Sequence, residues 1–264
     1  MDLDLDGKLA LVTGSTKGIG RAIAAELAAE GAEVIVHGRR ADEVDAVVAE
    51  LSVRHKVHGV VGDLATADGT AAVISAVGAF GPVEILVNNA ATFRAAPFGE
   101  LSDADWDHVF QVNLMAAVRL SREFFPSMLA AGWGRIVYIS SDYAVQPNQY
   151  LLHYSVSKTA GMSFVRGLAE LTKGTGVTVN TVIAGPTWTE GAAGFLENSV
   201  GDRDVDEVKR EFFAPGGFLS GSLLDRYAEP REVAGLVAFV CSPRASAING
   251  AAQRVEGGFV KSIM

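Results

Sequence analysis

The chain has 264 residues, of which 49% are hydrophobic, and it carries a net charge of −9. This composition supports a large apolar core and argues against disorder. An acidic surface repels nucleic acid and anionic lipid, no apolar run approaches the length of a membrane span, and the acidic start MDLDLDGK lacks the apolar centre of a signal peptide. We therefore expect a cytoplasmic protein with no nucleic-acid and no membrane partner. The single cysteine, Cys241, excludes an internal disulfide, and the histidine spacing predicts no metal site.

Short apolar runs alternate with longer amphipathic stretches along the chain. The runs are rich in Val and Ile and predict strands at LALVTG, EVIVHG, KVHGVVGD, VEILVNN, GRIVYISS, GVTVNTVI and AAQRVEGG. The stretches between them predict helices over 18–30, 41–52, 67–79, about 113–131, about 154–174 and 230–241. This alternation predicts a single doubly wound α/β domain over 1–264, with a mainly parallel sheet covered by helices on both faces.

The segment 188–229 interrupts the alternation. It mixes charges and glycines with large apolar side chains, among them Phe195, Leu196 and Phe212. Long insertions in compact α/β domains are usually lids or disordered loops. The aromatic residues favour a lid over a substrate.

The stretch TGSTKGIG follows the first predicted strand and opens the first predicted helix. Gly14 permits a tight turn, and Gly18 and Gly20 allow backbone and ligand to approach closely. The free N–H groups and positive dipole end of that helix favour a pyrophosphate. A glycine-rich turn alone is equally consistent with a plain βα connection, but its place after the first strand of an alternating chain favours a dinucleotide.

The end of the second predicted strand indicates which dinucleotide. An enzyme that uses NAD usually has Asp or Glu there, which binds the ribose 2′-hydroxyl. This chain has Gly38 followed by Arg39 and Arg40, and Lys17 adds a cation in the glycine loop. Because guanidinium groups pair with phosphate oxygens, we assign Lys17 and Arg39 to the 2′-phosphate of NADP. We interpret Arg40 as a solvated surface charge and consider NAD the less suitable cofactor.

The stretch YSVSK places Tyr154 and Lys158 four residues apart, on one face of a helix. A phenol has a pKa of about 10 and a nearby ammonium lowers it, so this pair can exchange a proton with an alcohol or carbonyl oxygen. Ser141 ends the strand GRIVYISS, where its hydroxyl can hold the substrate oxygen, and Asn113 can hold a water that links Lys158 to solvent. Each of these residues alone is equally consistent with a structural role.

As a set, TGSTKGIG, NNAA at 88–91, Asn113, Ser141 and YSVSK resemble the short-chain dehydrogenase/reductases in order and spacing, over nearly the whole chain. The resemblance implies a seven-stranded Rossmann-like sheet, an NAD(P) cofactor and a catalytic tetrad. In that tetrad Tyr154 is the general acid/base, and Lys158 lowers its pKa and binds the nicotinamide ribose. Ser141 orients the carbonyl and Asn113 supports the proton relay.

The resemblance also implies the cofactor contacts. Asp63 is expected at the adenine, Asn89 in the cofactor cleft, and Thr187 and Thr189 at the nicotinamide carboxamide, while Asn88 is expected to be structural. The full set of expected contacts is Gly14, Ser15, Thr16, Lys17, Gly18, Ile19, Gly20, Arg39, Asp63, Leu64, Asn89, Ala90, Tyr154, Lys158, Gly185, Thr187 and Thr189.

Two positions depart from the family pattern. Ala91 stands where a glycine is usual, and the usual Pro-Gly after the sixth strand appears as AGPTWT, beginning at Ala184.

The activity implied is NADPH-dependent hydride transfer between nicotinamide and a ketone or secondary alcohol, with a small-molecule substrate. The surroundings of the tetrad are mostly apolar or aromatic, which favours a hydrophobic or ring-bearing carbonyl. Two alternatives stay open: an NAD-dependent alcohol dehydrogenase, and a non-catalytic NADP-binding sensor or scaffold. The resemblance further implies a homotetramer or homodimer.

Overall fold

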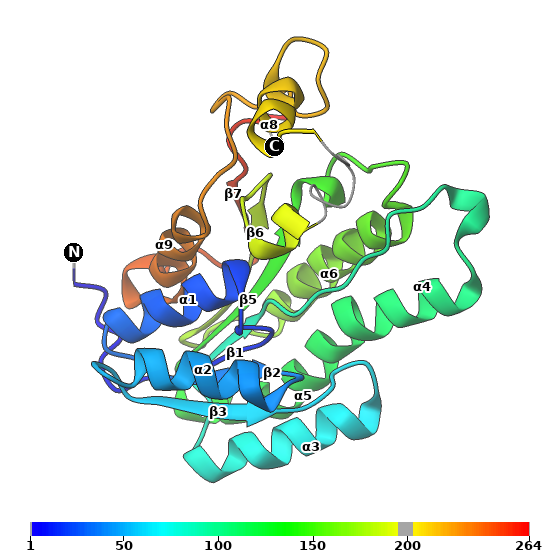
Figure 1. Ribbon diagram of the computed structural model, residues 1–264. Coiled ribbons are helices and arrows are strands. Elements are labelled where there is room, and N and C mark those ends of the chain that lie inside the picture. The colour runs from blue at the N-terminus through cyan, green and yellow to red at the C-terminus, as the bar shows by residue number, and fades with distance from the viewer. Residues whose placement is uncertain (1, 195–202, 264) are drawn as a thin grey trace.

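The computed structural model describes residues 2–194 and 203–263 (Figure 1). Its strands form one sheet in the order β3-β2-β1-β4-β5-β6-β7, with every neighbouring pair parallel. The strands are β1 (Leu9–Val12), β2 (Glu33–Gly38), β3 (Val57–Val61), β4 (Ile85–Asn88), β5 (Gly134–Ser141), β6 (Val177–Ala184) and β7 (Ala252–Val255). The predicted seven-stranded parallel sheet is confirmed.

The α-helices whose full bounds lie in the described residues include all those predicted, together with α4 and α8. They are α1 (Gly18–Ala29), α2 (Ala41–Leu51), α3 (Ala67–Val77), α4 (Asp103–Phe110), α5 (Ala116–Ala131), α6 (Leu152–Glu170), α8 (Val205–Phe213) and α9 (Pro230–Cys241). The unpredicted helices α4 and α8 both begin at a side-chain cap. Ser102 and Asp105 form a reciprocal capping box at α4, and the Asp204 carboxylate accepts the Glu207 N–H at α8. None of the helices in the described ranges is long and apolar enough to cross a membrane.

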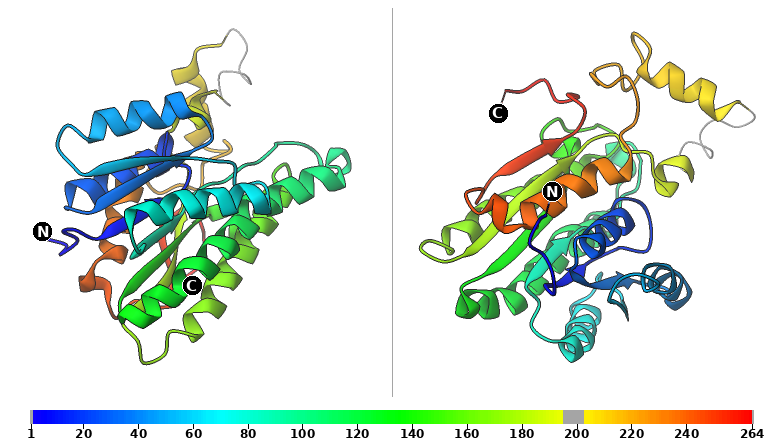
Figure 2. Two further views of the ribbon diagram at one scale, coloured as in Figure 1. Left: turned by 90° about the horizontal axis from the view of Figure 1, so that it is seen from below. Right: turned by 90° about the vertical axis from the view of Figure 1, so that its left-hand side faces the viewer.

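Strand β1 illustrates why helices cover both faces of the sheet. Successive side chains of a strand point to opposite faces. Leu9 and Leu11 pack in an apolar cluster with α3, α5 and α6, whereas Ala10 and Val12 pack in a second cluster with α1, α2 and α9. Figures 1 and 2 show these two helix layers on either side of the twisted sheet. Near-continuous apolar strands are therefore buried from both sides.

The chain order places the functional segments at the carboxyl ends of the central strands. From β1 the chain builds β2 and β3 outward in one direction, and β4 then returns to the opposite side of β1. In open parallel sheets, ligands bind beyond the carboxyl ends of the strands at this change of direction. The glycine loop follows β1, the NNAA stretch ends β4, and Ser141 ends β5, so all three meet there.

The segment expected to be a lid lies beyond the end of β6. Thr187 pairs with Ala228 in an isolated parallel bridge, and between them α8 stands apart from the two helix layers (Figures 1 and 2). Phe213 and Leu219 form a small apolar cluster with Phe259. Residues 195–202, with Phe195 and Leu196, lie outside the described residues, and the lid role stays a prediction.

Candidate active site

The glycine loop needs its glycines for its own packing. Gly14 and Gly18 have φ of 62° and 56°, which favours glycine. A Cβ on Gly20 would lie 2.3 Å from the Gly14 carbonyl oxygen and 2.4 Å from Asn89 Nδ2. Close approach at Gly20 was predicted for a ligand, but the atoms that exclude a side chain there belong to the turn itself.

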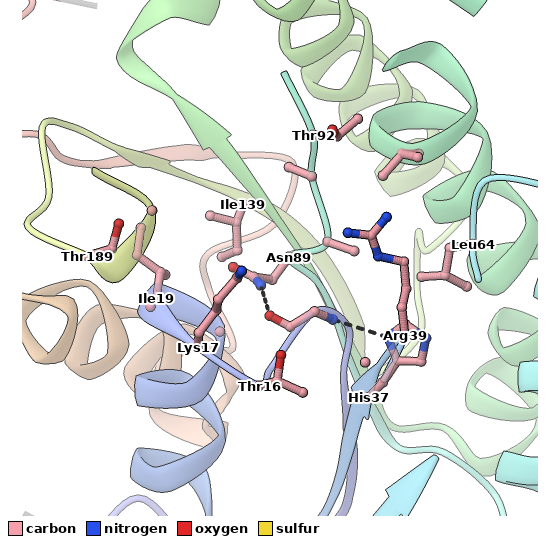
Figure 3. A pocket seen from close by; sticks show the side chains of 18 of the residues that line it. Thr16, Lys17, Ile19, His37, Arg39, Leu64, Asn89, Thr92, Ile139 and Thr189 are labelled. Carbon is pink, nitrogen blue, oxygen red and sulfur yellow. Dashed lines mark hydrogen bonds between the residues drawn. The ribbon is translucent and has the colours of Figure 1, made fainter. Parts of the chain in front are cut away.

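Two side chains outside the loop hold it in place. Asn89 Nδ2 donates to the carbonyl oxygens of Thr13, at 2.9 Å, and Gly14, at 3.0 Å. His37, at the end of β2, accepts the Gly14 N–H at Nδ1 at 3.2 Å, so its Nε2 donates to the Gly62 carbonyl at 3.2 Å. Figure 3 shows both contacts to Gly14. Burial disfavours the charged imidazole and lowers the pKa of His37 to about 4.

A cavity of about 710 Å³ opens above the loop. All the predicted cofactor contacts line it except Ser15 and Thr187. Ser15 is fully buried, and its hydroxyl donates to the Val12 carbonyl and accepts the His37 N–H, so the side chain holds the turn, and its contact with the cofactor stays a prediction. Thr187 lines a smaller neighbouring cavity, and its hydroxyl donates to the Gly185 carbonyl at 2.9 Å.

The cations of the large cavity differ in their partners. Within the described residues Lys17 and Arg39 make no ion pair, whereas Arg40 pairs with Asp42 and lies 3.7 Å from Glu43. Figure 3 shows the side chains of Lys17 and Arg39 extending on either side of Thr16. Lys17 and Arg39 are therefore available to a phosphate, and Arg40 is neutralised by neighbouring carboxylates.

The start of α1 holds an anion in this structure. Glu190 Oε2 accepts the Gly18 N–H at 2.9 Å, although the two residues are far apart in sequence. A helix N-terminus favours negative charge because its first N–H groups lack intrahelical partners. A side-chain carboxylate at this point shows that the loop accepts an anion where the pyrophosphate of a dinucleotide would lie. The residues present thus fit an NAD(P)-type cofactor.

Tyr154 and Lys158 lie together, but burial controls their protonation. Lys158 Nζ donates to the Ile139 carbonyl at 2.7 Å and lies 5.7 Å from the centre of the Tyr154 ring. Burial lowers the pKa of Lys158 to about 7 and raises the pKa of Tyr154 to about 12, against the opposing effect of a hydrogen bond with Ser141. Burial therefore dominates the pKa of Tyr154 in this structure, and the role of Lys158 in lowering that pKa stays a prediction.

Asn113 lies in a π-helical turn, Gln111–Met115, between α4 and α5. Its amide Oδ1 accepts the Thr92 N–H at 2.8 Å, and Nδ2 donates to the Thr92 carbonyl and the Ser157 hydroxyl, each at 3.0 Å. Its backbone carbonyl accepts the Tyr138 hydroxyl at 2.8 Å, and the Tyr138 ring lies 4.9 Å from Lys158 Nζ. Asn113 thus reaches the lysine through Tyr138.

A second cavity of about 300 Å³ adjoins the first. Ser141 and Tyr154 line both cavities. The segment after β6 supplies much of the second cavity's wall, through Phe212, Leu219 and Tyr227. The two hydroxyls therefore stand between a space with phosphate-binding features and a mostly apolar space.

A family model described as short chain dehydrogenase matches residues 8–199. The chain is also 47% identical over 265 residues to the uncharacterized oxidoreductase YvrD of Bacillus subtilis, with 100% of each chain covered. The chain belongs to the short-chain dehydrogenase/reductase family. These dehydrogenase/reductases are oxidoreductases, and the family predicted from the motifs is confirmed.

Relatives of known activity lie further away in sequence. A 3-oxoacyl-[acyl-carrier-protein] reductase, FabG of Aquifex aeolicus, is 34% identical over 261 residues, covering 98% of this chain and 99% of the relative. The crystal structure of L-sorbose reductase from Gluconobacter frateurii, complexed with NADPH and L-sorbose, matches with a TM-score of 0.94 at 34% identity and covers 100% of both chains.

Sequence reasoning missed some contacts of this dehydrogenase/reductase site. His37 stands inside the apolar run EVIVHG, where a polar residue is the one available signal. The sequence places Asp142 and Glu190 in segments expected to line the substrate pocket, but it carries no signal for their contacts with Ser141 and Gly18.

Proposed function

We propose that the protein is an NADPH-dependent carbonyl reductase in which Tyr154 protonates the substrate oxygen. The observation that carries the proposal is that Ser141 and Tyr154 line both cavities. A carbonyl in the smaller cavity can then meet two hydroxyl groups at the boundary with the cofactor cavity. FabG and L-sorbose reductase are both reductases, which supports this direction of reaction.

The cofactor is NADP, held in the larger cavity. The start of α1 binds the pyrophosphate, Lys17 and Arg39 bind the 2′-phosphate, and Asp63 lies at the adenine end. The NADPH-bound L-sorbose reductase structure supports this assignment. When bound, the nicotinamide supplies the hydride that reduces the carbonyl carbon.

Protonation of Tyr154 favours reduction. Because burial raises the pKa of Tyr154 to about 12, the phenol keeps its proton at neutral pH and can give it to the developing alkoxide. Ser141 donates a hydrogen bond to the same oxygen and stabilises its negative charge. Lys158, whose pKa burial lowers to about 7, can return a proton to the tyrosine. Asn113 holds the π-helical turn whose carbonyl accepts the Tyr138 hydroxyl beside the lysine.

The test is NADPH oxidation across a panel of ketones, aldehydes, quinones and acyl thioesters, with NADH measured in parallel. Tyr154→Phe should lower kcat by about 10²- to 10⁴-fold without weakening NADPH binding, because it removes the general acid alone. Tyr150→Phe, at an exposed tyrosine of the loop before α6, is the matched control and should leave kcat unchanged.

Each outcome has a distinct reading. Turnover with NADPH that disappears in Tyr154→Phe supports the proposal. Turnover that persists in the variant refutes the role of Tyr154, and tight NADPH binding without turnover of any carbonyl favours a sensor. The cytoplasmic location, the homo-oligomer and the lid stay predictions.

A further inference from the structure

Tyr138, in β5, is a buried phenol behind the reacting groups. It is 1% exposed, packs in the apolar cluster under α5 and α6, and is not among the described residues that line either cavity. A Val or Ile at this strand position would need no hydrogen-bond partner, whereas a buried hydroxyl costs free energy without one. The contacts of the Tyr138 ring and hydroxyl give a reason for a tyrosine here.

The ring of Tyr138 faces the ammonium group of Lys158. Nζ lies 4.9 Å from the centre of the Tyr138 ring, closer than the 5.7 Å that separates it from the centre of the Tyr154 ring. Lys158 is 2% exposed, and its Nζ donates to the Ile139 carbonyl at 2.7 Å. An aromatic face attracts a cation, and the attraction is stronger where water is excluded. The Tyr138 ring therefore favours the charged form of the lysine.

The hydroxyl of Tyr138 fixes the ring in this position. It donates to the backbone carbonyl of Asn113 at 2.8 Å, in the π-helical turn Gln111–Met115. The Asn113 amide group is itself bonded to the Thr92 backbone and to the Ser157 hydroxyl. The ring is thus held between an anchored turn and the lysine.

Gly161 makes room for the ring. It lies three residues after Lys158, on the same face of α6. A Cβ on Gly161 would lie 2.3 Å from Tyr138 Cζ and 2.5 Å from the Tyr138 hydroxyl oxygen. Glycine inside a helix is unfavourable compared with alanine. This glycine therefore serves the placement of the Tyr138 ring.

We propose that Tyr138 is a positioning residue for the reduction: its ring holds the Lys158 ammonium beside Tyr154 and keeps it charged, so that the lysine can return a proton to the tyrosine. This inference rests on the proposed reductase function. Tyr138 itself stays a neutral phenol, because burial raises its pKa. It acts on the lysine through the face of its ring.

The protonation of Lys158 reflects two opposing influences. Burial lowers the pKa of Lys158 to about 7, and the ring face of Tyr138 opposes that shift because it favours the ammonium over the neutral amine. The turn 111–115 and strand β6, which also pack against α6, carry no titratable side chain. The titratable groups that face Lys158 are Tyr138 of β5 and Tyr154 of α6, while Asp142, after β5, and Asp105, of α4, act on Tyr154 and His153.

The first experiment measures the pKa of Lys158 by NMR titration of the full chain labelled with ¹³C at lysine Cε, and Lys158→Met identifies the signal. Tyr138→Leu should lower this pKa by about 0.5 to 1.5 pH units, because it removes the ring and keeps the position apolar. Tyr138→Phe is the matched control: it keeps the ring, so the pKa should stay near the wild-type value. Both variants lose the bond to the Asn113 carbonyl. A merely structural role would therefore change both alike.

Gly161→Ala displaces the same ring without altering Tyr138. Because the new Cβ takes the place of the ring, the pKa of Lys158 should fall in the same direction as in Tyr138→Leu. Gly167→Ala is the matched control on α6, since a Cβ on Gly167 would meet no atom of the described chain within 4 Å. An unchanged pKa of Lys158 in Tyr138→Leu, or in Gly161→Ala if Tyr138→Leu does not fold, overturns the inference. An equal fall in Tyr138→Phe overturns it too.

The pH profile of kcat links this pKa to turnover. If Lys158 must be charged to return the proton, kcat falls as the pH rises through its pKa, and in Tyr138→Leu that fall should come at lower pH. Above both midpoints kcat should be about 3- to 30-fold below the wild-type value, with KM for the carbonyl unchanged. If the protein reduces no carbonyl, the proposed function fails, and the NMR titration still decides the role of Tyr138. If it reduces carbonyls and the fall in kcat does not move in Tyr138→Leu, the inference alone fails.

Discussion

The neutral, buried imidazole of His37 predicts a specific loss of stability in acid. His37 connects the Gly14 N–H to the Gly62 carbonyl and is 2% exposed. Its pKa is about 4 in the folded protein, against an ordinary value of 6.5. The folded state therefore binds this proton less readily than the unfolded chain. The stabilisation is fully present above pH 6.5 and is lost progressively as the pH falls through about 4.

The size of the effect follows from the two pKa values. At about 1.4 kcal/mol per pH unit, the full loss is about 3 kcal/mol, of which about 2 kcal/mol falls between pH 7 and pH 5. The assay is urea unfolding of the wild type and of His37→Gln at both pH values. His37→Gln cannot titrate, so its free energy of unfolding should fall by about 2 kcal/mol less than that of the wild type over this range.

Comparing two pH dependences cancels the other titrating groups and any constant cost of the substitution. If wild type and His37→Gln lose the same free energy of unfolding between pH 7 and pH 5, His37 is not a buried neutral imidazole. If His37→Gln does not fold, an NMR titration of the wild-type imidazole measures the same pKa, and a value near 6.5 would refute the reasoning.

Three further predictions concern the cofactor site and the opposite end of the sheet. Arg39→Ser should weaken NADPH binding by about 10- to 100-fold and leave NADH binding unchanged. Arg40→Ser is the control, because this side chain is already paired with Asp42, and it should change NADPH binding little. Equal effects of the two substitutions would contradict the assignment of Arg39 to the 2′-phosphate. Glu190→Gln should tighten NADPH binding by about two- to fivefold in equilibrium titrations, since the Glu190 carboxylate no longer competes with the pyrophosphate at the start of α1. Weaker NADPH binding by the variant would show instead that Glu190 stabilises the bound state. Arg135→Met should lower the free energy of unfolding, measured by urea denaturation, by about 1–3 kcal/mol without altering NADPH affinity. The reason is that the Arg135 guanidinium donates to buried carbonyls at the amino end of β5. An unchanged free energy of unfolding would refute this role.

Features that depend on neighbouring residues could be predicted from the sequence. The apolar runs and the helical periodicity between them predicted all seven strands and, among the α-helices with full bounds in the described residues, all except α4 and α8. These two helices are short, and each carries a local cap signal, Ser102 with Asp105 and Asp204 with Glu207, that periodicity does not detect. Helix α6 places Tyr154 and Lys158 one turn apart, so their proximity also follows from local geometry.

Other conclusions required segments that are distant in the chain to be placed together. Lys17 and Arg39 have no ion-pair partner among the described residues, which depends on how distant segments pack around them. Arg40 is different, because its partners Asp42 and Glu43 follow it closely in the sequence. The sequence also does not indicate that the Ser15 hydroxyl contacts β2, where it accepts the His37 N–H. Spacing along the chain carries no information about such contacts.

The protonation of Tyr154 also separates what local sequence predicts from what the packing of the whole chain decides. From the sequence, Lys158 should lower the pKa of Tyr154, because a neighbouring cation favours the phenolate. In the folded protein burial raises the pKa of Tyr154 to about 12, and the opposing effect comes from a hydrogen bond with Ser141. The sequence by itself thus determined the fold and the family and predicted the candidate reacting groups, since periodicity, turn chemistry and motif spacing are local properties. Only the tertiary structure decided the charge of those groups and the partners of Asp142, His37 and Glu190, because the exclusion of water and contacts through space depend on the whole packed chain.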